Sequence, residues 1–126
     1  MPKTLADFEV IKTLGRGTFG TVSLAKVKKE DYLVALKKMN KTKNKNEIVR
    51  QLRAFKNEIE LHAPLQHENV VRLLGFFSDE LSVHLILEFV PKGSLYGLLP
   101  KNGFSERDCV NYTKQVAMAL VYLHNQ

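Results

Sequence analysis

The sequence has few of the features that mark disulfide-rich, membrane or metal-binding proteins. Cys109 is the single cysteine among 126 residues, so an internal disulfide framework is excluded and a reducing compartment suits the chain. The apolar run that ends at Leu123 is far shorter than the roughly 20 residues of a membrane-spanning helix. The four histidines do not show the spacing of metal ligands, so we expect no metal site. The first ten residues carry Asp7 and Glu9 and no apolar stretch, so we expect no secretory signal.

Positive charge is in excess, and much of it is local. The formal net charge is +6, and five lysines fall within residues 37–45. A basic excess favours anionic partners. A nucleic-acid surface would also need interleaved aromatic residues or a recognisable module, and neither accompanies this run. We therefore expect a solvated lysine loop, and nucleic-acid binding is the weakest of the functions considered.

The hydrophobic pattern predicts strands followed by helices. Extended segments are expected at 8–14, from Gly20 onward, and at 32–39, 70–77 and 82–88. From Glu47 apolar residues recur three or four apart, which predicts a helix that ends before Pro64. A short helix is expected at 95–99, and the capping sequence at 105–108 opens a longer helix on which Cys109 would face the core. This order predicts an α+β fold.

The segment LGRGTFGTV at 14–22 carries three glycines at G-x-G-x-x-G spacing. A dinucleotide-binding fold would need a helix after the third glycine and an acid about 20 residues later. Here a strand pattern follows Gly20, and residues 39–41 contain no acid. The Gly-Lys-Ser/Thr of a Walker loop is also absent. The remaining interpretation is a hairpin whose glycine tip covers the phosphates of a nucleotide.

Such a hairpin needs a positive charge beneath it. Side chains on a strand repeat every two residues, so Ala35 and Lys37 share one face of the third strand. A small residue beside a lysine leaves room for a flat base and places a cation at the phosphates. A buried lysine requires a carboxylate partner, and Glu58 lies at the edge of the apolar stripe of the predicted helix.

Together these segments resemble a protein kinase. The matching stretches are GRGTFGTV at 15–22, VALK at 34–37, NEIELHAPLQHENVVRL at 57–73 and LILEFV at 85–90. Within the kinases the sequence is most similar to the Aurora serine/threonine group, on QLRAFKNEIELHAPLQHENVVRLLGFF and LILEFVPKGSLY. His62 fits this group too, whereas the interval from Lys37 to Glu58 is longer than in the Aurora pattern.

The resemblance implies both an architecture and a set of site residues. It implies an N-terminal tail at 1–7, a small lobe at 8–90 with a five-stranded antiparallel sheet and one main helix, and a hinge with two helices of an incomplete large lobe at 91–126. Lys37 and Glu58 would be the catalytic residues, with Glu58 holding Lys37 at the first two phosphates. The implied ATP-binding residues are Leu14, Gly15, Arg16, Gly17, Thr18, Phe19, Gly20, Val22, Ala35, Lys37, Leu87, Glu88 and Val90.

Two motifs that kinases use for chemistry are absent from the sequence. A His-Arg-Asp loop positions the acceptor hydroxyl and an Asp-Phe-Gly motif helps hold magnesium, and neither occurs here. We expect the chain to bind ATP without transferring phosphate, while the full-length form would use ATP and magnesium to phosphorylate Ser/Thr hydroxyls of proteins. The alternative is a non-catalytic module that sequesters an activator protein on its small lobe. An Aurora-like protein would be cytoplasmic or nuclear, with spindle or centrosome association and no membrane partner.

Overall fold

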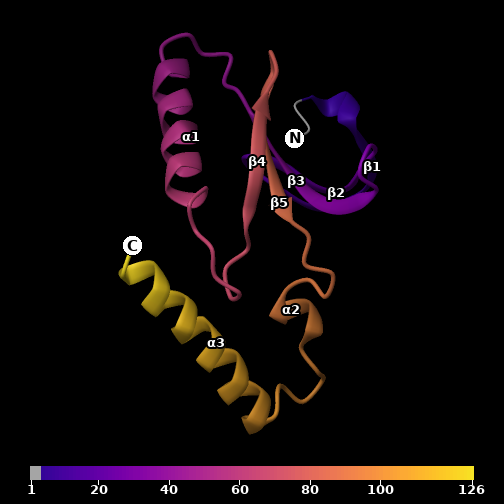
Figure 1. Ribbon diagram of the computed structural model, residues 1–126, viewed down its shortest axis with the longest axis vertical. Helices are drawn as coiled ribbons and strands as arrows, with labels where there is room; N and C mark the ends of the chain where they lie inside the picture. The colour runs from indigo at the N-terminus through magenta and orange to yellow at the C-terminus, as the bar shows by residue number, and fades with distance from the viewer. Residues whose placement is uncertain (1–3) are drawn as a thin grey trace. The chain divides into compact units, whose positions relative to one another are not determined.

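Five antiparallel strands pair in the order β1-β2-β3-β5-β4 (Figure 1). The computed structural model describes residues 4–126. Strands β1 (Phe8–Gly17), β2 (Gly20–Val27) and β3 (Tyr32–Asn40) follow one another in sequence and in space, and β5 (Ser82–Glu88) lies between β3 and β4 (Leu73–Ser78). The predicted α+β class and the five-stranded antiparallel sheet are confirmed.

The sheet buries residues on both faces, because the strand period of two sends alternate side chains of β3 in opposite directions. Val34 and Leu36 belong to one apolar cluster, and Met39 belongs to the other. The first cluster consists of Phe8, Ala25, Val27, Val34, Leu36, Phe77 and Ile86. The second consists of Met39, Ile59, Leu73, Val83 and Leu85. Since Met39 packs with Ile59, the odd-numbered side chains of β3 face the helix.

Helix α1 (Ile48–His62) lies beside the edge strand β4 (Figure 1). Its apolar residues have the predicted helical period, but Ile59 is the one described residue of the helix that is buried. At its start, Glu47 makes no side-chain capping bond. The first half of α1 is therefore held to the sheet by little apolar burial.

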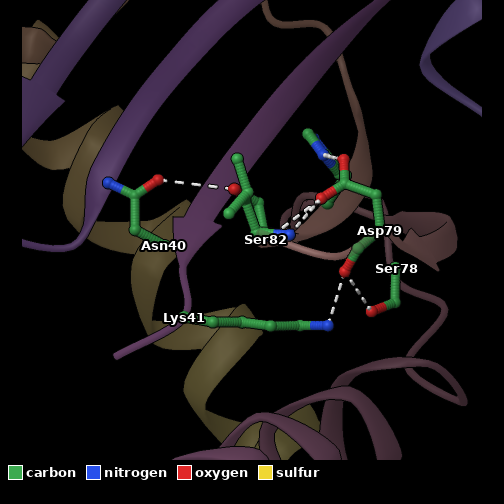
Figure 2. Close-up of polar contacts among 7 residues, drawn as sticks. Asn40, Lys41, Ser78, Asp79 and Ser82 are labelled. Atoms are coloured by element: carbon green, nitrogen blue, oxygen red, sulfur yellow. Dashed lines mark hydrogen bonds and ion pairs between the residues drawn. The ribbon is translucent and has the colours of Figure 1, made fainter. Parts of the chain in front are cut away.

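The β4–β5 turn is closed by Asp79 (Figure 2). Its Oδ1 accepts hydrogen bonds from the backbone N–H groups of Leu81 (2.9 Å) and Ser82 (2.8 Å), and its Oδ2 lies 2.8 Å from Nε2 of the buried His84. The hydrogen bond from His84 and the two backbone bonds lower the pKa of the Asp79 carboxyl below 3.8. Lys41, from the predicted lysine loop, donates its Nζ to the backbone carbonyl of Asp79. That lysine is thus part of the fold and not free in solvent.

Contacts divide the chain into two units, each described by itself. One runs to Leu65 and resumes at Arg72–Phe89, and it holds the sheet and α1. The other consists of Gln66–Val71 and Val90–Gln126. It contains α2 (Leu95–Leu98) and α3 (Glu106–His124).

Within the second unit, side-chain caps begin both helices. The hydroxyl oxygens of Ser94 and Ser105 accept from the backbone N–H groups of Gly97 and Asp108. The hydroxyl of Tyr122 on α3 accepts from the N–H of Gln66 at 2.7 Å, which fixes the helix to the short 66–71 segment. Across residues 4–126, no helix is both long enough and apolar enough to cross a bilayer.

Three expectations about the elements are corrected. Strand β1 continues past Gly15 to Gly17, because the flanks of the glycine loop stay paired as far as Gly17 and Gly20. Strand β4 begins at Leu73, since the turn in which Val70 donates to His67 occupies the preceding residues. Cys109 is exposed on α3 and not in a core. A 3-10 turn, η1 (Leu5–Asp7), was not predicted.

Candidate functional site

The glycine loop is the tip of the β1–β2 hairpin, and backbone contacts fix it on both sides. Gly15 pairs with Val22 and Gly17 with Gly20, so the hairpin stays paired to its end. Register shifts interrupt β1 before and after Lys12, and such bulges increase strand twist. The carbonyl of Phe19 at the tip accepts a hydrogen bond from the N–H of Asn40 at 3.1 Å. The loop is thus held against the end of β3.

The third glycine is required by the space around it. Gly20 has a φ of 146°, and a Cβ placed there would lie 2.0 Å from the carbonyl oxygen of Lys38. At Gly15 and Gly17 a Cβ would meet nothing within 4 Å. The backbone of the loop therefore has one face against β3 and one face open.

A cavity of about 250 Å³ lies beneath this loop. Its lining residues are Gly15, Arg16, Gly17, Phe19, Gly20, Thr21, Val22, Lys37 and Lys38. The three cations among them suit an anionic group. The volume is below the roughly 300–1,000 Å³ of pockets that enclose a drug-sized ligand, so the cavity fits part of a nucleotide.

Lys37, which lines this cavity, is paired with Glu58. The Nζ of Lys37 lies 3.3 Å from Oε1 of Glu58, so a strand in the middle of the sheet and helix α1 are joined by an ion pair. Their side chains are 34% and 44% exposed, which leaves Lys37 within reach of a ligand. Glu60, the other acid of α1, pairs with Lys56 at 3.8 Å on the exposed side of the helix.

Three of the predicted ATP-binding residues share the sheet face that carries Lys37. Val22 is paired directly with Lys37, and Ala35 lies two residues before Lys37 on β3. Leu87 is paired with Ala35 across the β3–β5 ladder. Paired residues of antiparallel strands lie on the same face, so this surface continues from the cavity towards β5.

The other predicted site residues lie elsewhere. Leu14 and Thr18 do not line the cavity, and Leu14 is partly exposed in the interrupted part of β1. Glu88 uses its side chain and its N–H to bond the backbone of Arg72, at 3.1 and 2.9 Å. Val90 belongs to the second unit.

Two residues near the site were missed in the sequence. The carboxamide of Gln51 on α1 donates from Nε2 to the carbonyl of Asn40 at 3.0 Å and accepts at Oε1 from the N–H of Thr42 at 2.7 Å. Asn40 also donates its N–H to Phe19. No pattern in the sequence signals these contacts, because the partner groups belong to the main chain, which every residue carries.

Comparison with known proteins identifies the family. A model of the protein kinase domain matches residues 8–126. The chain belongs to the protein kinase family. This kinase chain is 42% identical over 125 residues to serine/threonine-protein kinase Aurora-2 of Arabidopsis thaliana, with 98% of this chain and 43% of that protein covered.

Two other relatives carry the same family name. The kinase chain is 45% identical over 121 residues to an Aurora kinase of Schizosaccharomyces pombe, which covers 94% of this chain and 33% of that protein. It is 38% identical over 131 residues to Aurora kinase B-A of Xenopus laevis, which covers 100% of this chain and 36% of that protein. The resemblance to Aurora kinases is confirmed, and the chain spans less than half the length of these relatives.

Proposed function

We propose that the sheet unit binds ATP, with the phosphates under the glycine loop and the adenine along the face of Val22, Ala35 and Leu87. The observation that carries the proposal is the Lys37–Glu58 ion pair at 3.3 Å beside the cation-lined cavity. Backbone N–H groups of the open loop face would approach the phosphates, and Lys37 would bond two of them. Glu58 would hold the direction of the Lys37 ammonium. The backbone carbonyl of Glu88, at the end of β5, would bond the edge of the adenine.

In the whole protein we propose that this unit serves a serine/threonine protein kinase acting on hydroxyls of protein substrates. Magnesium neutralises phosphate charge in such enzymes. Within residues 4–126 no three His, Cys, Asp or Glu side chains group as metal ligands. We expect the chain by itself to bind nucleotide and to transfer no phosphate. For the Aurora-like whole protein we propose a cytoplasmic or nuclear location with spindle or centrosome association.

Titration with a fluorescent ATP analogue tests nucleotide binding. Lys37→Ala removes a charge-assisted hydrogen bond and should weaken binding about tenfold or more. Lys29→Ala is the matched control, because it removes the same charge from the exposed β2–β3 turn and should leave affinity unchanged. Equal affinities of the wild type and Lys37→Ala would count against this site.

A groove between α1 and β4 favours a second function, the binding of an activator. A cavity of about 450 Å³ lies there. Its lining residues are Leu52, Phe55, Lys56, Ile59, Glu60, Ala63, Phe76, Ser78 and Val83. Most of these are apolar, and Phe76 is 56% exposed on an edge strand. Such a groove suits a peptide with aromatic or aliphatic anchor residues.

Selection of displayed random peptides on the chain tests this second function. We expect selected peptides to carry paired apolar anchors and to lose binding to Phe76→Ser. Leu81→Ser is the control, because Leu81 is 70% exposed and does not line the groove. Peptides that bind both variants equally would exclude the groove as their site.

A further inference from the structure

Helix α1 is joined to β3 at two points. One is the Lys37–Glu58 ion pair, and the other is the pair of hydrogen bonds that Gln51 makes with Asn40 and Thr42. We propose that Gln51 is a positioning residue, which holds α1 so that Glu58 stays against Lys37. The relevance of this role to nucleotide binding rests on the proposed function of the site.

The spacing of the two links supports this role. Gln51 and Glu58 are seven residues apart, or about 10 Å along one face of a helix. Lys37 and Asn40 are three residues apart, or about 10 Å along a strand. The two elements therefore run side by side in opposite directions, with the same distance between links on each. A helix fixed at Asn40 presents Glu58 at the level of Lys37.

The chemistry of glutamine suits the contact. A carboxamide carries one carbonyl acceptor and an NH₂ donor, the same groups as a backbone peptide. Gln51 uses its donor towards residue 40 and its acceptor towards residue 42, as the backbone of a paired strand would. In one orientation only, its NH₂ meets a carbonyl and its oxygen meets an N–H. Glutamate has the same length but would place a carboxylate oxygen against the carbonyl of Asn40.

The first half of α1 depends on this contact because little else holds it. Val49 is 64% exposed and Leu52 is 40% exposed, and the buried Ile59 lies in the second half. The carbonyl that Gln51 binds belongs to Asn40, whose N–H also holds Phe19 at the tip of the glycine loop. Gln51 thus ties α1 to the point where the loop is fixed.

A test without nucleotide separates this inference from the proposed function. The whole 126-residue chain can be acylated and then digested, so that mass spectrometry of the peptide that contains Lys37 follows the rate at which the Lys37 amine is modified. Glu58→Gln breaks the ion pair and sets the reference, an increase of about threefold on the scale of a part-exposed pair. Gln51→Met keeps the length of the side chain and removes both hydrogen bonds, so it should raise the rate similarly. Arg50→Met, which introduces the same residue at the exposed neighbouring position, should not raise the rate.

The double variant decides whether Gln51 acts through Glu58. In the Glu58→Gln background, Gln51→Met should not increase the acylation rate of Lys37 any further. In the wild-type background, Gln51→Glu should increase this rate as much as Gln51→Met does. Equal rates for Gln51→Met and the wild type, or the same increase with and without Glu58, would overturn the proposal. Thermal unfolding of each variant shows that it is folded. Failure of the wild type to bind the ATP analogue would overturn the proposed function and leave the acylation result standing.

Discussion

The centre of the sheet and helix α1 are held in different ways within one unit. Strands β3 and β5 bury most of their apolar residues, with Val34 and Ile86 fully enclosed. Helix α1 buries one described residue, Ile59, and packs the partly buried Phe55 against the same cluster. Its other links to β3 are made by polar side chains. Packing fixes the sheet within narrow limits, whereas hydrogen bonds and an exposed ion pair permit a helix to shift at small cost. Lys37 is therefore held in place by the packed sheet, whereas its partner Glu58 can shift with helix α1.

The strongest test of this comparison is a cavity at the centre of the sheet. Ile86→Ala should lower the free energy of unfolding by about 2–5 kcal/mol, because the residue has no exposed surface and its neighbours can close the space only in part. Denaturant unfolding measures the change. Leu81→Ala, at a side chain that is 70% exposed, is the control and should change little. A small loss for Ile86→Ala would mean that the sheet is no more firmly packed than the helix.

The glycine loop should respond to the next largest change. Gly20→Ala places a methyl group 2.0 Å from the Lys38 carbonyl at a φ of 146°, so we expect a loss of about 1–3 kcal/mol. Gly17→Ala, where a Cβ meets nothing within 4 Å, serves as the control for the same substitution in the same loop. Thermal unfolding compares the two. Equal effects would show that the loop is not fixed against β3.

The stabilisation that Asp79 gives the β4–β5 turn should depend on pH. The pKa of Asp79 is lowered by its hydrogen bond from His84 and by two backbone N–H groups, so its stabilisation is present above the ordinary value of 3.8. It should be lost as the pH falls through the lowered value. Asp79→Asn should be less stable than the wild type at neutral pH, and the difference should shrink in acid. Urea midpoints between neutral and acid pH measure this, and a difference that does not vary with pH would contradict it.

The smallest effect is expected on the helix. Leu52→Ala removes a side chain that is already 40% exposed, so the loss should be about 0.5–1 kcal/mol. The measurement is the same unfolding titration, with Ile59→Ala as the comparison on the buried side of α1. If the loss at Leu52 equalled that at Ile59, burial would hold the first half of the helix after all.

Much of the fold could be predicted because its signals are local. The glycine hairpin, the strand that carries Lys37 and the helix that carries Glu58 each follow from periodicity and from residues that end an element. The pairing of Lys37 with Glu58 was inferred from the needs of a buried charge and from family resemblance. The strand limits at Gly17 and Leu73 were misjudged, because cross-strand pairing and a turn decide them.

The contacts of the site that were missed are of another kind. The chain reverses direction between β3 and α1, and this brings Gln51 against Asn40 and Thr42. No pattern of polar residues predicts that reversal. The hydrogen bond between Asp79 and His84 depends on which face of β5 carries His84 and on how the β4–β5 turn places Asp79 relative to that face. Cys109 was assigned to a core from its helical position, although α3 leaves that position exposed.

Asn40 is hydrogen-bonded to the hairpin tip, to α1 and to β5. Two of these three links use its backbone N–H and carbonyl and not its side chain. Its N–H reaches Phe19 and its carbonyl is bound by Gln51, while its side chain accepts a hydrogen bond from the Ser82 hydroxyl at 3.5 Å. Replacement of its side chain would therefore leave the junction between hairpin tip and helix intact. Proline alone lacks the N–H and would detach the tip. Most residue types at position 40 can therefore keep this junction, and proline cannot.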